Sequence, residues 1–273
     1  MNQPLGAMMT EEARRRLPAG RKARLAAHVA ENGQVTVAEL ADMFGVSVDT
    51  IRRDLDQLDA DGVLIRTHGG AVSPDALPKP DTGLEIRRRV QTSAKELIGG
   101  LAASLVQDGQ SILVNGGTTV LALARALRDR SDLTIATNNL LLPSEIPAGV
   151  YRSLYVFGGI VRESAQATIG PVTFTPLGSP GVDVNADLAF VAIGGLTVAG
   201  GYSTSNVAEA QMMRDMMDRA DKVAVLCDST KFGRKLFAQF APLERADYIV
   251  TEAPPAPEFR DAFAERGIEV LTP

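Results

Sequence analysis

One stretch of the chain has the residue types needed to bind a small anion. It reads, in order, Ile112, Leu113, Val114, Asn115, Gly116, Gly117, Thr118 and Thr119. The apolar run predicts a strand, and the glycines precede a helical pattern. Backbone N–H groups at the start of that helix would face outwards, where the helix dipole favours negative charge. The threonine hydroxyls add donors, so the stretch predicts a phosphate site, although glycine and threonine also begin ordinary helices.

Further polar side chains follow later apolar runs and are candidates for the same site. Thr137 and Asn138 end the next run, and Lys231 follows a run that ends at Asp228. Because ligands gather at the carboxyl ends of parallel strands, we expect these residues near Gly117. Lys231 would meet a phosphate as a point charge, and its alternative interpretation is a surface lysine. The predicted effector-binding residues are Asn115, Gly116, Gly117, Thr118, Thr119, Thr137, Asn138, Arg162, Glu209 and Lys231.

A second group of candidates lies near the N-terminus, where two helical patterns flank a glycine. Thr36 can cap the first helix and Ser47 the second. Gly45, between them, permits the positive φ that a sharp turn needs. The second helix, predicted over 48–59, has apolar residues at helical spacing that share one buried face. These are Ile51, Leu55 and Leu58.

Two arginines, Arg52 and Arg53, fall on or beside the opposite face of the second helix, close to its start. A helix that enters the major groove needs this arrangement, since arginine offers bidentate donors to guanine or a charged contact to phosphate. The helix also carries acidic residues, which we expect to repel phosphate and to tilt its far end out of the groove. These are Asp54, Asp56, Asp59 and Asp61.

Residues 63–72 contain two short β patterns around a glycine turn, which predict a hairpin or wing. Arg66 and His68 could reach DNA from it, and His68 has an equal alternative as a turn residue. Asp49 could read a cytosine, cap the helix or simply be solvated. The predicted DNA-binding residues are Thr36, Ser47, Val48, Asp49, Thr50, Arg52, Arg53, Arg66 and His68.

The predicted helices and strands that would position the anion-binding and the DNA-binding candidates fall into two folded domains. After the proline-rich segment 74–84, apolar runs alternate with amphipathic helical patterns, which favours a mainly parallel sheet covered on both faces. The fold class is therefore α/β, with an N-terminal winged helix-turn-helix domain joined to a larger sheet domain. The predicted limits are 1–17 for a flexible extension, 18–73 for the DNA-binding domain, 74–84 for a linker and 85–273 for the larger sheet domain.

Composition narrows the class of protein. The chain of 273 residues has a net charge of -5, so a role in DNA binding must rest on the placement of charge and not on its total. No run of about 18 apolar residues indicates a membrane helix, and a cytoplasmic location is the expectation. The single cysteine excludes an internal disulfide. We expect no catalytic residue, metal or cofactor.

The order of these motifs resembles the DeoR family of bacterial transcription regulators. In the N-terminal part the matching residues are Phe44, Gly45, Val46, Ser47, Thr50, Ile51, Arg52, Arg53, Asp54, Leu55, Leu58, Gly62, Arg66, His68, Gly69, Gly70 and Ala71. Beyond residue 84 they are Gly117, Thr118, Thr119, Thr137, Asn138, Gly158, Gly159, Arg162, Gly170, Asp187, Ala189, Phe190, Glu209, Ala210, Arg214, Asp228, Lys231, Phe232 and Gly233.

The resemblance implies a sheet related to ribose-5-phosphate isomerase, a sugar phosphate or similar effector, and a homodimer or homotetramer. Residues 85–273 would then be the effector-sensing and oligomerisation domain. It also implies a protein that represses an operon for carbohydrate or polyol metabolism until the effector releases it from operator DNA. The chain departs from the family at Asn115, where aspartate is common, and at Met213, where lysine is common. These departures leave the effector's identity open.

Two other interpretations compete with a regulator. One is a sugar-phosphate isomerase-like enzyme with an accessory helical domain, for which Asp228 and Glu209 are the candidate acids or bases. Asn115 argues against it, because an amide cannot act as the base in proton transfer between sugar carbons. The other is a protein-binding module that merely carries a winged helix.

Overall fold

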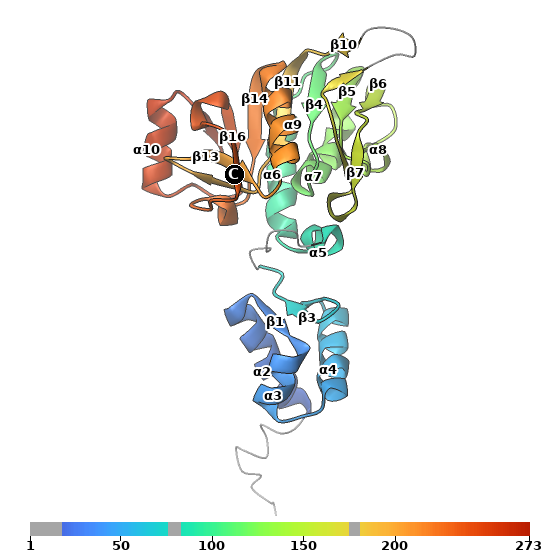
Figure 1. Ribbon diagram of the computed structural model, residues 1–273, viewed down its shortest axis with the longest axis vertical. Helices are drawn as coiled ribbons and strands as arrows, with labels where there is room; N and C mark the ends of the chain where they lie inside the picture. Colours follow the sequence, from blue (N-terminus) through green and yellow to red (C-terminus); the bar gives the residue numbers. More distant parts are fainter. Residues whose placement is uncertain (1–17, 76–82, 175–180) are drawn as a thin grey trace, which may run out of the picture. The chain divides into compact units, whose positions relative to one another are not determined.

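The structure, a computed structural model, describes residues 18–75, 83–174 and 181–273 (Figure 1). The extension predicted over 1–17 lies outside the described residues, as does most of the predicted linker, residues 76–82. Within the described ranges, no helix is both long enough and apolar enough to cross a membrane.

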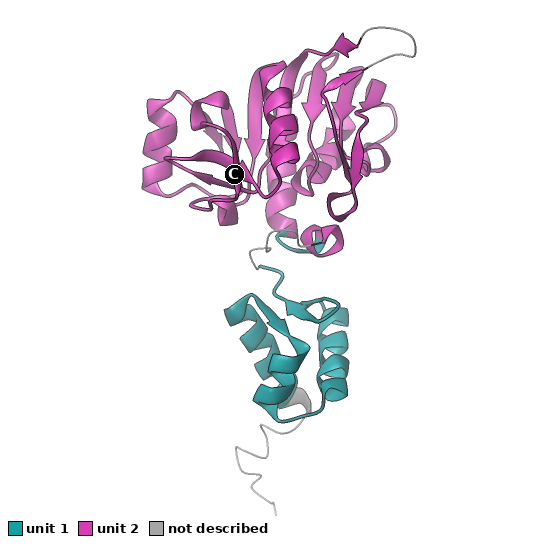
Figure 2. Cartoon of the chain, viewed as in Figure 1, with its two compact units in different colours: residues 1–78, 89–91 teal, residues 79–88, 92–273 magenta. Residues whose placement is uncertain are grey.

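Contacts divide the chain into two compact units (Figure 2). Unit 1 comprises residues 1–78 and 89–91, and unit 2 comprises residues 79–88 and 92–273. Each unit has its own hydrophobic core, so each is described by itself.

Unit 1 is a small helical domain with a three-stranded sheet. Its elements are α2 (Pro18–Asn32), β1 (Gln34–Thr36), α3 (Val37–Phe44), α4 (Val48–Ala60), β2 (Ile65–Arg66) and β3 (Gly70–Val72). The strands pair antiparallel in the order β1-β3-β2. Ile51, Leu55 and Leu58 are buried on α4, as predicted, and pack with Leu25 of α2 and Leu40 of α3. The winged helix-turn-helix expectation is confirmed.

Two glycines set the turns of unit 1. Gly45 ends α3 in the left-handed conformation, with φ +62°, and its N–H donates to the carbonyl groups of Ala41 and Asp42. Gly70 begins the returning strand of the wing, where an added Cβ would lie 1.9 Å from the carbonyl oxygen of Val35. Only glycine allows the wing to pack this closely against β1.

The main element of unit 2 is a seven-stranded parallel sheet with the order β17-β16-β14-β11-β4-β5-β6. Its strands are β4 (Ser111–Val114), β5 (Leu133–Thr137), β6 (Tyr151–Val156), β11 (Ala186–Ala192), β14 (Ala220–Leu226), β16 (Tyr248–Val250) and β17 (Glu269–Leu271). Each coincides with an apolar run of the sequence, so the predicted parallel α/β class is confirmed.

The helices of unit 2 cover both faces of this sheet (Figure 1). Those on its faces are α6 (Thr92–Ser104), α7 (Thr119–Ala126), α8 (Leu142–Glu145), α9 (Val207–Asp218) and α10 (Pro257–Glu265). Helix α5 (Leu84–Arg89), whose last residue belongs to unit 1, precedes them in the chain. Along β14, Val225 packs in the core formed by α9 and α10, whereas Ala224 and Leu226 pack in the core formed by α6 and α7. This alternation follows from the two-residue period of a strand.

Short strands that the apolar pattern does not predict complete unit 2. They are β7 (Ile160–Arg162), β8 (Ala167–Ile169), β9 (Thr173–Phe174), β10 (Val182–Asp183), β12 (Gly195–Thr197), β13 (Gly201–Thr204) and β15 (Ala238–Ala241). Strands β12, β13 and β15 form a separate antiparallel sheet, and β7 pairs with β8. The β7–β8 hairpin brings Arg162 to the edge where β4 and β5 end.

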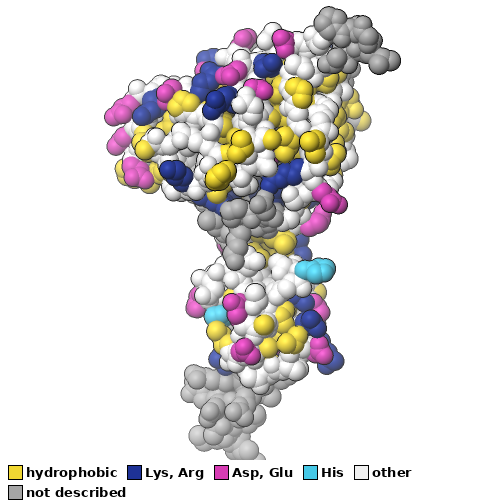
Figure 3. Space-filling model, in the orientation of Figure 1, with side chains coloured by type: hydrophobic (Ala, Val, Ile, Leu, Met, Phe, Trp, Pro, Cys, Tyr) yellow, Lys and Arg dark blue, Asp and Glu magenta, His cyan; other side chains and the backbone are white. Residues whose placement is uncertain are grey.

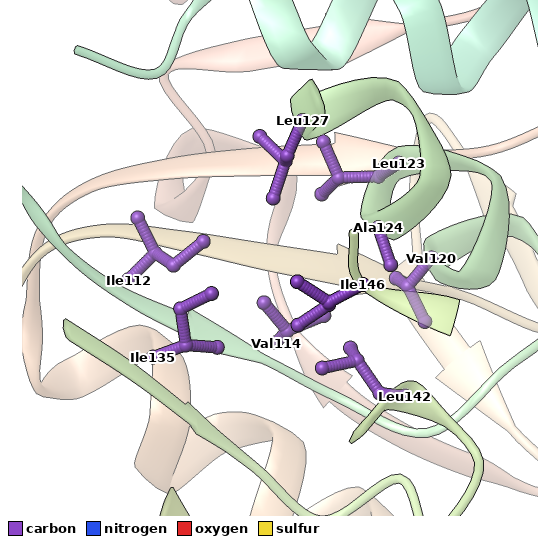
Figure 4. Close-up of a pocket in the computed structure, with 9 residues that line it drawn as sticks. All are labelled: Ile112, Val114, Val120, Leu123, Ala124, Leu127, Ile135, Leu142 and Ile146. Carbon is purple, nitrogen blue, oxygen red and sulfur yellow. The ribbon is translucent and has the colours of Figure 1, made fainter. Parts of the chain in front are cut away.

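A packing gap between α7, α8 and the sheet leaves about 170 Å³ not occupied by atoms (Figure 4). Aliphatic side chains alone line it, among them Ile112, Leu123 and Ile146. Such a lining offers no hydrogen-bond partner to a phosphate or a hydroxyl. The gap is therefore part of the core and not the candidate effector site.

Candidate DNA-reading helix and effector site

The helix-turn-helix is held by side chains at both helix starts. Thr36 and Glu39 form a reciprocal capping box at α3, in which the Thr36 N–H donates to Glu39 at 2.7 Å. Ser47 caps α4 by accepting from the Thr50 N–H at 3.3 Å. Both caps are exposed, so their hydroxyls also lie where DNA could meet them. The distances show that both side chains stabilise helix starts by capping them.

Both arginines of the predicted pair are exposed on α4. The Arg52 guanidinium lies 3.3 Å from the Asp49 carboxylate, and this pair is solvated on both sides. Such a surface pair contributes little to stability, so Arg52 can exchange Asp49 for another partner. Arg53 has no hydrogen-bond or ion-pair partner among the described residues. The guanidinium groups therefore face outwards at the helix start, as a recognition helix requires.

The expectation that Asp54 repels phosphate is wrong. Asp54 is only 5 % exposed, and its carboxylate accepts from the Arg21 guanidinium of α2 at 2.5 Å and 3.3 Å. Its position three residues after Ile51 places it on the buried face of α4. A carboxylate that is buried and neutralised in this way holds α2 against α4 and does not face DNA.

The charges of two further acidic residues of α4 are also compensated. Asp56 accepts from the Arg66 Nε at 2.9 Å, and Asp59 accepts from Arg89 at 2.7 Å. Figure 3 shows Lys and Arg side chains next to Asp and Glu side chains over unit 1. The predicted repulsion of phosphate is thus weakened at these two positions, and Asp61 remains exposed.

Arg66 forms its hydrogen bonds within unit 1, at the base and turn of the wing. Besides Asp56, it donates through Nη1 to the carbonyl groups of Thr67 and Gly70, at 2.9 Å and 2.7 Å. The guanidinium therefore closes the turn of the hairpin, and its predicted contact with DNA stays a prediction. His68, at the tip of the same turn, is exposed.

The first interpretation of Asp54 is that it repels DNA phosphate, and the second is that it forms a buried ion pair with Arg21; the variant Asp54→Ala distinguishes them. We expect a loss of unfolding free energy of about 3 kcal/mol for unit 1, because the charge of Arg21 would be left beside the core without its partner. Asp56→Ala, which removes an exposed carboxylate, should cost under about 1 kcal/mol. Urea unfolding followed by circular dichroism checks both values. An Asp54→Ala protein of wild-type stability with tighter DNA binding would restore the first interpretation.

In unit 2, Asn115 lies where β4 ends, but its amide is engaged with the backbone. Its Nδ2 donates to the Ala192 carbonyl and its Oδ1 accepts from the Ala192 N–H, both at 2.9 Å. The side chain thus extends the pairing of β4 with β11 in the manner of one more peptide group. Each end of the amide keeps one further N–H group or lone pair, so Asn115 shapes the site and its predicted contact with an effector stays a prediction.

Thr137 and Asn139 hold the glycine turn from the neighbouring strand. The buried Thr137 hydroxyl donates to the Val114 carbonyl at 2.6 Å and accepts from the Asn139 N–H at 3.0 Å. Asn139 in turn donates to the Gly117 carbonyl at 3.1 Å. Thr137 is therefore a positioning residue, and Asn139 is a residue of the site that is not among the predicted effector-binding residues.

The glycine turn presents free donors. The N–H groups of Gly116, Gly117 and Thr118 donate to no described residue, and Thr118 makes no side-chain cap at the start of α7. Gly117 has φ +151°, a conformation that L side chains rarely adopt. Thr119 is buried, with 7 % of its surface exposed. The turn has the form of an anion site at a helix N-terminus.

A narrow pocket lies between this turn and α9; about 180 Å³ of it is not occupied by atoms, but it is too tight to admit a water molecule. Its lining residues are Asn115, Gly116, Asn138, Glu209, Met212, Met213 and Met216. Both positions at which the chain departs from the family, Asn115 and Met213, are in this lining. Glu209 accepts from Arg162 at 3.0 Å and from Thr204 at 2.7 Å. The structure thus brings together Asn115, Gly116, Asn138, Arg162 and Glu209 as the sequence analysis expected.

Lys231 is absent from the lining of this pocket and belongs to a second cluster at the carboxyl end of β14. Its Nζ lies 3.6 Å from Asp228, whose side chain is 2 % exposed. Lys95, in the first turn of α6, is 7 % exposed and interacts electrostatically with Asp228 and Lys231. Arg234 also interacts with Asp228. The cluster therefore gathers three cations around one carboxylate.

Lys95 is the second site residue that is not among the predicted effector-binding residues. Burial, together with the charges of Lys231 and Arg87, lowers the pKa of Lys95 to about 8, although Asp228 opposes the shift. Burial likewise lowers the pKa of Lys231. Lysine ammonium groups at the edge of a sheet are electrostatically suited to a phosphate. Among the described residues, no group of three or more His, Cys, Asp or Glu side chains is placed to hold a metal ion.

Comparison with known proteins identifies the family. A family model of the DeoR C-terminal sensor domain matches residues 90–253, and one of the DeoR-like helix-turn-helix domain matches residues 21–76. The chain belongs to the DeoR family. As a DeoR-family protein it is a DNA-binding transcription regulator with a sensor domain.

Named relatives span almost the whole of this DeoR-family chain. A transcriptional regulator GlpR of Haloferax volcanii is 31 % identical over 256 residues, which cover 93 % of this chain and 98 % of the relative. A putative aga operon transcriptional repressor of Escherichia coli O157:H7 is 27 % identical over 252 residues, or 92 % of each protein. The transcriptional repressor GlcR of Bacillus subtilis is 29 % identical over 241 residues, covering 88 % and 91 %.

Among solved structures, the chain has a distant similarity to the ribose 5-phosphate isomerase A of Methanocaldococcus jannaschii. It is 14 % identical, covers 53 % of this chain and 56 % of its own, and superposes with a TM-score of 0.36. At that score the likeness carries no argument about the site.

Proposed function

We propose that this DeoR-family protein is a repressor that a phosphorylated sugar or related metabolite releases from operator DNA. In the proposal, α4 reads the operator through Arg52 and Arg53, with contacts from Ser47, Val48 and Thr50 at its start. Thr36, Asp49 and the wing residue His68 are further candidate contacts. The regulated genes belong to carbohydrate or polyol metabolism. The outward-facing arginine pair on a capped helix supports the DNA-binding half of the proposal.

The effector half rests on one observation: cations and free backbone donors gather at the carboxyl-end edge of the sheet. Lys95 and Lys231 supply positive charge, and the N–H groups of 116–118 supply neutral donors with the Thr118 hydroxyl. Phosphate is the common small anion that needs both kinds of partner. Glu209 and Asn138 line the part of the site that would receive the carbon skeleton, and Arg162 pairs with Glu209.

The enzyme alternative is less well supported by the same contacts. Glu209 is tied to Arg162 and Thr204, and Asp228 is buried against Lys231, so each candidate base already has partners. The amide of Asn115 cannot accept a proton from a sugar carbon at neutral pH. We therefore propose regulation without turnover.

Assembly and location complete the proposal. A homodimer or homotetramer would place two copies of α4 on the two halves of a palindromic operator. An effector could then act by binding one arrangement of the assembly better than the other, and would shift DNA affinity only by that difference. The protein would work in the cytoplasm, where it meets both DNA and metabolites.

DNase footprinting of the region upstream of the protein's own gene tests the proposal. We expect a protected, two-fold symmetric site that is lost when pentose or hexose phosphates are added. The same phosphates should be recovered unchanged after incubation with the protein. Turnover of a phosphate together with no protected site would favour the enzyme, and protection that no phosphate relieves would remove the effector role.

A further inference from the structure

Helix α5 is joined by hydrogen bonds to elements of unit 2 that carry or adjoin effector-site residues. The Lys95 ammonium, from the cluster at the end of β14, donates to the Arg87 carbonyl in the last turn of α5. The Arg87 guanidinium donates to the Ser164 carbonyl at 3.2 Å, between β7 and β8. The neighbouring Arg88 donates to Glu145 of α8 at 2.8 Å. The position of α5 in unit 2 thus depends on the region proposed to bind the effector.

The last residue of α5 belongs to unit 1, where it contacts α4. The chain passes from unit 2 to unit 1 between residues 88 and 89, and it returns between residues 91 and 92. Within unit 1, Arg89 donates to Asp59 of α4 at 2.7 Å and 3.4 Å. The Asp59 carboxylate also accepts from the Arg66 N–H of the wing at 2.9 Å. A displacement of α5 would therefore act on the end of α4 and on the wing together.

The segment that follows α5 is anchored in unit 1 in a strained conformation. Gln91 has φ +54°, which residues other than glycine rarely adopt. Its N–H donates to the Pro74 carbonyl and its Nε2 to the Asp75 carbonyl, both at 2.9 Å. Val90, beside it, is fully buried. Strain that the surrounding contacts maintain is found in segments that switch between two arrangements, so a movement of α5 would not be absorbed in a loose linker.

A phosphate in the cluster at the end of β14 would compete with α5 for Lys95. The ammonium now donates to a neutral carbonyl, whereas a hydrogen bond to a phosphate oxygen joins two charges and is about twice as strong. In a longer helix the Gln91 N–H would pair with the Arg87 carbonyl, but it donates to Pro74 instead. The ammonium takes its place, so drawing the ammonium to a ligand weakens the attachment of α5 to unit 2.

From these contacts we propose that α5 transmits effector binding from unit 2 to α4, with Arg88 and Arg89 as positioning residues. Arg88 holds the helix to α8, and Arg89 passes its displacement to Asp59. Neither arginine touches the effector in this proposal. The inference rests on the proposed repressor function and adds the route by which the ligand regulates DNA binding.

The coupling factor, which is operator affinity without a phosphate divided by operator affinity with it, measures this transmission. Fluorescence anisotropy of labelled operator determines it for the full chain with ribose 5-phosphate, glucose 6-phosphate, fructose 6-phosphate and glycerol 3-phosphate, each at saturation. With the phosphate that releases the wild type most, we expect a factor of about ten. Arg88→Ala and Arg89→Ala should each lower it below about three, while calorimetry without DNA shows phosphate affinity within about twofold of the wild type.

Two control variants show that the coupling factor responds to the position of the charge. Arg128→Ala removes an exposed arginine of unit 2 with the same change in net charge, and should keep the wild-type factor. Arg88→Lys should keep most of it, because a lysine can still pair with Glu145. An arginine with a merely structural role would change operator or phosphate affinity without changing the ratio. By reciprocity, operator should weaken phosphate binding by the same factor.

The possible failures are distinguishable. A wild-type coupling factor in either folded alanine variant of α5 would overturn the inference and leave the proposed function standing. If circular dichroism shows that an alanine variant does not fold, the methionine variant at the same position takes its place. Absence of release of the wild type by all four phosphates would instead remove the effector function on which the inference depends.

Discussion

Arg53→Ala is expected to lower affinity for the operator by about tenfold or more, the loss associated with one specific arginine contact. Arg53 is exposed on α4, and no described residue competes for its guanidinium. Arg52→Ala should also weaken binding, but by less, since Arg52 must first leave Asp49 at 3.3 Å. Fluorescence anisotropy with labelled operator at several salt concentrations measures both effects.

The salt series also shows what each arginine contacts. Loss of a phosphate contact should reduce the slope of log affinity against log salt by about 1, whereas loss of a base contact should relax one base position. Arg128→Ala is the matched control, because it removes an exposed arginine of unit 2 with the same change in net charge. Control-level affinity in both α4 variants would exclude this helix as the reader.

Lys95→Met should strongly reduce phosphate binding and at the same time stabilise the free protein. The lowered pKa of about 8 means that at pH 7 the folded state holds a charge that burial disfavours. The shift from 10.5 to about 8 corresponds to about 3 kcal/mol of unfolding free energy. Thermal unfolding and phosphate titration at pH 7 measure the two opposite changes.

The pH dependence has a defined sign. Between about pH 8 and pH 10.5 the unfolded state binds more protons at Lys95 than the folded state, so this residue makes stability rise with pH in that window. A phosphate stabilises the protonated lysine, so its affinity should fall above about pH 8 as the free protein loses that proton. Lys95→Met should remove most of this fall.

Lys22→Met, in unit 1, is the control for loss of a lysine charge outside the cluster. Its phosphate affinity and pH profile should match the wild type. If Lys95→Met destabilised the protein and left phosphate affinity unchanged, the lysine would be a structural partner of Asp228 and not part of the effector site.

Elements with a strong period were predictable from sequence. The spacing of Ile51, Leu55 and Leu58 correctly predicted the buried face of α4. Apolar runs of the sequence likewise correspond to the strands of the parallel sheet. The turn at Gly45 and the helix cap at Ser47 were also predictable, because a positive φ and a helix cap need particular residue types.

Residues whose partners are distant in sequence were not predictable in the same way. Helical spacing places Asp54 on the buried face of α4, but nothing local shows that Arg21, 33 residues away, neutralises it. Asn115 has the residue type of a ligand contact, yet it is engaged by Ala192, 77 residues away. In the sequence, Lys95 is not distinguishable from an ordinary lysine on a helix surface, because its interaction with Asp228 exists only in the folded chain.

The central claim is that a phosphorylated ligand bound in unit 2 releases the DNA read by unit 1. The most direct test follows operator anisotropy for the wild type and Lys231→Ala while a panel of sugar and alditol phosphates is titrated. The account predicts equal operator affinity without ligand, release of the wild type, and retention of the variant at the same ligand concentration. Release of both proteins at the same concentration would contradict it.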